Sequence, residues 1–94
     1  MTFDKDGICE LESITSVDEC EAYRYFLEGE RRRHMSALQE ASRKAAFHGQ
    51  AAYPYFQDVA RFFDSAALRH QQDLDAITKR LEEIEAHKAG LNHV

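Results

Sequence analysis

Apolar residues recur every three or four positions along two long stretches of this chain, separated by a short segment that contains Gly49 and Pro54. This spacing aligns them along one face of an α-helix. The first stripe comprises Val17, Cys20, Tyr23, Leu27, Leu38, Ala41 and Ala45, and the second comprises Phe56, Val59, Phe63, Ala66, Leu74, Ile77, Leu81 and Ile84. The pattern predicts two amphipathic helices, over about residues 17–47 and about residues 54–88.

The residues at the helix ends agree with these limits. Ser16 and Glu19 fit a capping box at the start of the first helix. Gly49 is expected to end that helix as a left-handed C-cap, and Pro54 is expected to open the second helix. The short linker between them favours an antiparallel hairpin.

The register of this hairpin is predicted from the facing apolar residues. Aligning Leu27 with Leu74 also brings the other apolar positions of the two stripes opposite one another. In this register Glu30 is expected to face His70, and His34 lies one turn further along the same face as Glu30. A polar layer is therefore expected in the middle of the apolar seam.

The first 15 residues follow a different pattern, with a turn signal at Asp4–Gly7 and a few apolar residues after it. We predict an N-terminal arm or short extended segment over residues 1–15 and a helical hairpin domain over residues 16–94. The fold class is then all-α: an antiparallel two-helix hairpin with a short N-terminal arm. Because a two-helix hairpin buries only one stripe per helix, we also expect a homodimer that forms a four-helix bundle.

The polar layer suggests two alternatives. Two imidazoles and a carboxylate, from Glu30, His34 and His70, suit zinc, iron or manganese, and Asp73 lies one turn after His70. The arrangement resembles half of a ferritin-like carboxylate bundle, although that family uses Glu-x-x-His and this chain has Glu-x-x-x-His and His-x-x-Asp. The alternative is a buried Glu–His hydrogen-bonded pair that fixes register and partner choice.

Aromatic residues gather where the predicted helices meet the linker. Tyr55, Phe56, Phe62 and Phe63 are expected to form a dimer interface or a recognition surface for a partner protein. No glycine-rich phosphate loop or nucleophile with a positioned base is present in the sequence. These features favour a small non-enzymatic protein-interaction module, such as an adaptor, chaperone or inhibitor.

Charge and composition narrow the class of partner. The chain has 94 residues with 44% hydrophobic and 31% charged residues, which is typical of a globular domain. The acids are concentrated in residues 1–30, so nucleic acid is not the expected partner, whereas head-to-tail pairing or a basic partner fits. No apolar run approaches the length of a membrane span, and Cys9 and Cys20 are expected to be reduced thiols of a cytoplasmic protein.

The segment Phe47-His48-Gly49, between the two predicted helices, is similar to the Trp-x-Gly turn of small helical-hairpin substrates of type VII secretion. Phe47 stands at the position of the tryptophan of that family, and no tyrosine follows the second helix to supply the usual C-terminal export motif. This resemblance covers the hairpin only, and it implies an exported dimer.

Overall fold

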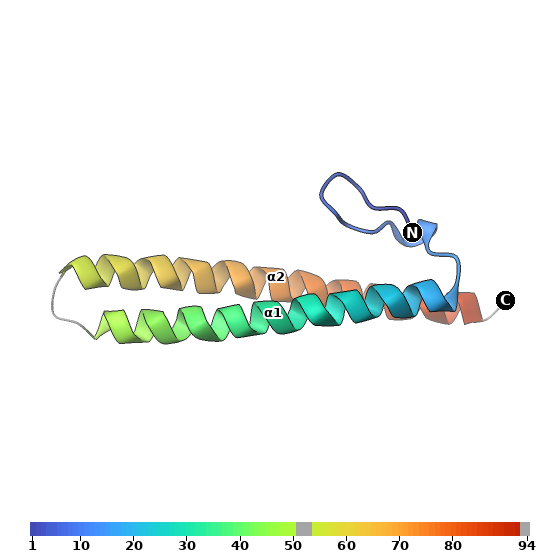
Figure 1. The fold of residues 1–94 in the computed structure, drawn as a ribbon. Coiled ribbons are helices and arrows are strands. Elements are labelled where there is room, and N and C mark those ends of the chain that lie inside the picture. Colours follow the sequence, from blue (N-terminus) through green and yellow to red (C-terminus); the bar gives the residue numbers. More distant parts are fainter. Residues whose placement is uncertain (51–53, 93–94) are drawn as a thin grey trace.

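Two long antiparallel helices lie side by side in the computed structural model, which describes residues 1–50 and 54–92 (Figure 1). Helix α1 spans Val17–Gly49 and helix α2 spans Pro54–Asn92, and a short 3-10 helix, η1, spans Leu11–Ser13. The molecule is a rod with extents of 63 × 22 × 15 Å. Its length follows from the two long helices, which rise about 1.5 Å per residue, and its small thickness follows from the single layer that they form. The predicted helical hairpin with an N-terminal arm is confirmed.

The start of α1 is capped as the sequence predicts. The Ser16 side chain accepts a hydrogen bond from the Glu19 backbone N–H, with 3.2 Å between nitrogen and oxygen. The Glu19 carboxylate in turn accepts from the hydroxyl of Thr15 at 3.2 Å and pairs with the amino group of Met1 at 3.0 Å. This carboxylate therefore joins the arm to the first turn of the helix.

The end of α1 differs from the prediction. The helix continues through Gly49, and the residue with a left-handed backbone in the described chain is Gly7, not Gly49. The side-chain amide of Gln57 donates to the Gly49 carbonyl at 3.0 Å. Because this contact from α2 satisfies a terminal carbonyl group, the helix does not need a left-handed glycine to close.

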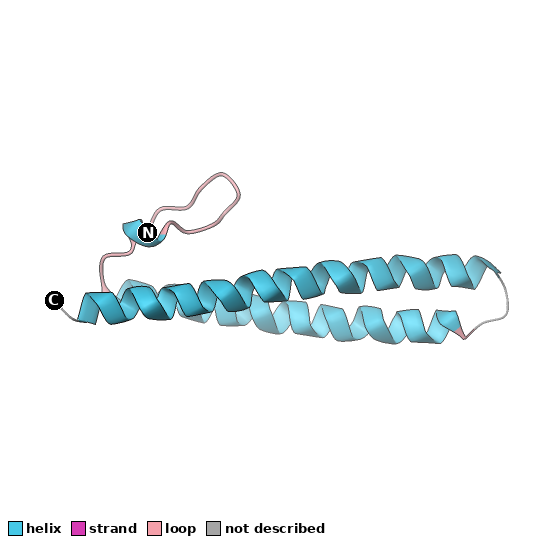
Figure 2. Cartoon of the chain, turned by 180° about the vertical axis from the view of Figure 1, so that it is seen from behind, coloured by secondary structure: helices cyan, strands magenta, loops and turns pink. Residues whose placement is uncertain are grey.

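The N-terminal arm folds back on itself and then joins the core (Figure 2). Phe3 and Cys9 form an antiparallel bridge around a turn in which Gly7 has φ of +80°. Cys9 and Ile14 are 0% and 1% exposed and pack against residues of both helices. Arg80 of α2 donates to the Cys9 carbonyl, which ties the arm to the hairpin.

The core is unevenly distributed along the rod. Around the chain termini it contains buried residues from the arm and both helices: Cys9, Ile14, Cys20, Tyr23, Leu27 and Ile84. Leu74 is buried further along α2. In the half next to the linker, the buried hydrophobic residues of the described chain are Ala41, Ala45 and Ala60. Among the described residues, the linker half of the hairpin thus has a thin fully buried interior of small side chains.

The helices are paired in a register about one turn from the predicted one. His34 contacts His70, and Tyr23 contacts Arg80. Apolar positions repeat every three or four residues, so a slip of one turn again brings apolar residues opposite one another. The predicted register was therefore wrong by about one turn, because the spacing of apolar residues does not distinguish the two registers.

Candidate functional site

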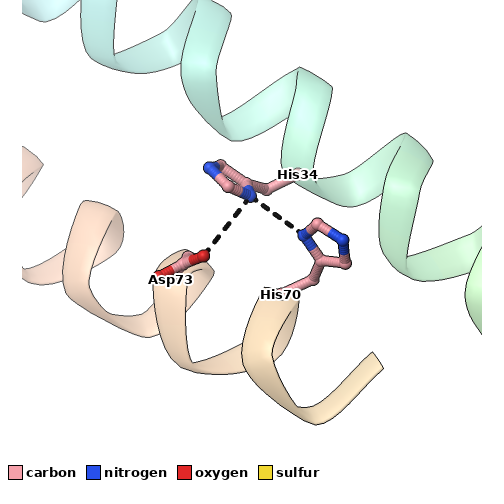
Figure 3. Close-up of side chains that lie close together, drawn as sticks. All are labelled: His34, His70 and Asp73. Carbon is pink, nitrogen blue, oxygen red and sulfur yellow. Dashed lines mark hydrogen bonds and ion pairs between the residues drawn. The ribbon is translucent and has the colours of Figure 1, made fainter. Parts of the chain in front are cut away.

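A polar layer crosses the middle of the hairpin and contains His34 from α1 with His70 and Asp73 from α2 (Figure 3). The Nδ1 atoms of the two imidazoles are 3.2 Å apart, and the Oδ2 atom of Asp73 lies 3.7 Å from the Nδ1 atom of His34. One potential ligand atom from each of the three side chains lies within 4.8 Å of the other two. Both imidazoles are partly buried, whereas Asp73 is exposed.

His34 and His70 were predicted as members of this layer, and the structure brings them together. The sequence also placed Asp73 one turn after His70, and this spacing orients both side chains of α2 toward His34 (Figure 3). The arrangement permits two kinds of chemistry. One imidazole can donate a hydrogen bond to the other, or the three side chains can share a metal ion.

Glu30 does not face His70 as the sequence predicted. Its carboxylate pairs with Arg33 on the same helix, at 2.8 Å. The shift of about one turn in register moves His34, rather than Glu30, opposite His70. A metal role for Glu30 remains a prediction. Asp73 lies one turn after His70 in the polar layer, as the sequence indicated.

A cavity of about 450 Å³ lies beside the polar layer. His34, Asp73 and Glu30 line it from the helices, and Gly7 and Ile8 of the arm form part of its wall. The sequence indicated a turn in the arm, but nothing in a periodic pattern shows which part of a hairpin such a turn will approach. This contribution of the arm was therefore missed.

The predicted aromatic residues have different environments. His48 of α1 stacks on both Phe56 and Phe63 of α2, with ring centroids 5.9 and 5.8 Å apart. Phe62 packs edge-on against Phe63 and is 62% exposed. The side chain of Tyr55 lies outside the described residues. Among the described side chains of this group, Phe62 is therefore the one that is largely exposed.

Ion pairs join the two helices near the chain termini. Lys88 of α2 pairs with Glu21 of α1, and Arg24 pairs with both Glu21 and Glu85, at 2.7 and 3.5 Å. The hydrogen bond from Lys88 lowers the pKa of the Glu21 carboxyl and raises the pKa of Lys88 itself. These contacts help to set the register of the helices.

Both cysteines are free thiols in the interior. Cys20 is 1% exposed, and burial raises the pKa of its thiol. A buried neutral thiol is a poor nucleophile.

Comparisons of the chain with models of protein families, with curated proteins and with solved structures gave no match. Within the described residues, neither helix is long and apolar enough to cross a membrane.

Proposed function

We propose that this protein is a non-enzymatic protein-interaction module whose first partner is a second copy of itself, and that two hairpins form a four-helix bundle. The observation that carries this proposal is the contrast in the linker half of the rod. There Phe62 is 62% exposed, while the buried hydrophobic positions hold only alanines in the described chain, and Phe26 of the terminal half is 53% exposed as well. Large exposed apolar side chains over a thin core are typical of a surface that is covered by another protein.

The distribution of charge supports an antiparallel arrangement of the two copies. Residues 1–30 together with 73–92, which form the terminal half, contain 14 acids and 5 bases. Residues 31–72, which form the linker half, contain 3 acids and 7 bases. An antiparallel second copy therefore lays its positive linker half over the negative terminal half of the first, and the reverse.

The position of Phe62 indicates which face is used. Phe62 precedes Asp73 by eleven residues, or about three helical turns, so both project from the same side of α2. Asp73 lines the cavity together with Phe26 of α1, which is 53% exposed. We call this side, with Phe26, Phe62 and Asp73, the cavity face, and we assign the second copy to it.

This geometry is compatible with two-fold symmetry. His34 and Asp73 lie near the middle of α1 and α2. A two-fold axis that passes near them brings Phe62 of one copy toward the Phe26 region of the other, and the same contact is repeated on the opposite side. An interface of this kind is closed, so it forms dimers rather than filaments.

Sedimentation velocity over a range of protein concentrations tests the proposal. We expect a dimer at micromolar concentration, with dissociation promoted by added salt because the two halves attract one another through exposed charges. A particle that stays monomeric up to the highest soluble concentration would contradict the proposal. A dimer that is tightened by salt would contradict the antiparallel arrangement.

A further inference from the structure

We propose that His34, His70 and Asp73 form a binding site for a divalent transition-metal ion, with zinc as the best fit. This inference concerns the single chain and does not depend on the proposed dimer. It rests on the convergence of three side chains from two helices, with two nitrogen atoms and one oxygen atom as ligands (Figure 3). Neutral imidazole and carboxylate are common ligands of zinc in proteins.

The distances between the side chains agree with shared coordination. Nitrogen ligands of a tetrahedral zinc ion, each about 2.0–2.1 Å from the metal, lie about 3.3 Å from one another. The Nδ1 atoms of His34 and His70 are already 3.2 Å apart. The Asp73 oxygen is 3.7 Å from His34, and its side chain is 58% exposed, so a small rotation is enough to bring it to a ligand position.

The surroundings of the site also suit a metal with an open coordination position. In the single chain, His34 and Asp73 line the cavity of about 450 Å³, which has room for a water molecule as the fourth ligand. Glu30 lines the same cavity, but Arg33 holds its carboxylate in an ion pair at 2.8 Å. We therefore assign Asp73, and not Glu30, as the carboxylate ligand.

The competing explanation for the 3.2 Å contact is a hydrogen bond between two neutral imidazoles. Binding experiments distinguish the two. The full chain is stripped with a chelator and titrated with Zn²⁺ by calorimetry, and Co²⁺ is added separately to record its visible absorption. We expect one ion per chain and the intense visible bands of tetrahedral cobalt.

Substitutions at matched positions identify the ligands. His34→Gln, His70→Gln and Asp73→Asn are each expected to weaken Zn²⁺ binding at least about tenfold, because loss of even an outer partner of a metal ligand costs about 10- to 100-fold in affinity. Glu30→Gln and Asp75→Asn remove equivalent carboxylates that we do not assign as ligands, and they should bind Zn²⁺ as the wild type does. Circular dichroism checks that each variant remains helical.

Three results would overturn the proposal. The first is a wild type that does not bind Zn²⁺. The second is an Asp73→Asn variant that binds Zn²⁺ with the affinity of the wild type. The third is a loss of affinity in Glu30→Gln and Asp75→Asn as large as in the variants of the proposed ligands. If either histidine variant loses its helicity, Asp73→Asn still decides the matter, because this exposed side chain contributes little to the core. The Co²⁺ absorption spectrum of Asp73→Asn then shows whether the tetrahedral bands have been lost.

Discussion

Replacement of Phe62 by alanine is expected to weaken self-association strongly. A phenylalanine buries roughly 150–250 Å² when fully covered. Phe62 is 62% exposed in the single chain, so about 120 Å² of it is available to an interface. At about 25 cal/mol per Å², this area corresponds to about 3 kcal/mol for each copy. Both copies of a symmetric dimer lose this contact, which sums to about 6 kcal/mol as an upper limit. Even half of this energy raises the dissociation constant by about 100-fold, which is the smallest effect that we expect.

A matched control separates the interface from general loss of apolar surface. Leu68 is 60% exposed and lies six residues after Phe62 on α2, which places it on a different side of the helix. Leu68→Ala is therefore expected to leave the dissociation constant almost unchanged. Sedimentation equilibrium of the wild type and both variants, at matched salt, measures the three constants. Equal effects of the two substitutions, or an unchanged constant for Phe62→Ala, would refute the assignment of the cavity face.

Further predictions concern stability and reactivity. Ile84→Ala removes a side chain that is 1% exposed in the core, and it should lower the free energy of unfolding by about 2–5 kcal/mol in urea titrations; a smaller loss would mean that this core is loosely packed. Because the Lys88 hydrogen bond lowers the pKa of Glu21, this pair contributes stability above the ordinary carboxyl pKa of 4.5 and loses it as the pH falls through the lower, folded value. The melting temperatures of wild type and Glu21→Gln should accordingly differ at pH 7 and converge in acid, and parallel pH profiles would contradict this reasoning. Cys9 and Cys20 are buried free thiols, so a thiol reagent such as DTNB should react with them much faster in denaturant than in buffer, and equal rates would show that the arm opens readily.

The fold was predictable because its determinants are local. The three-and-four spacing of residues such as Leu27 and Leu81 specifies helices, Ser16 begins the first one, and Pro54 begins the second. The arm was predicted less completely. Its turn is encoded by Asp4, whose side chain accepts from two backbone N–H groups at 2.9 Å, but its docking depends on distant contacts.

The register, and with it the composition of the polar layer, depends on contacts that a periodic pattern does not encode. A slip of one turn costs little apolar burial, since apolar residues still meet apolar residues. Polar contacts at both ends of the rod distinguish the alternatives: Lys88 pairs with Glu21 near the termini, and Gln57 donates to Gly49 beside the linker.

The identity of the candidate metal ligands follows from this choice of register. In the predicted register His70 meets a carboxylate and forms an ordinary polar pair, whereas in the observed register it meets a second imidazole, His34. Two imidazoles that face each other in a half-buried layer gain only about 0.5–1.5 kcal/mol from a mutual hydrogen bond. A cation that accepts both nitrogen atoms and the Asp73 oxygen turns this weak contact into a crosslink between the helices. Zn²⁺ should therefore raise the melting temperature of the wild type but not that of Asp73→Asn, and equal stabilisation of both would place the ion elsewhere.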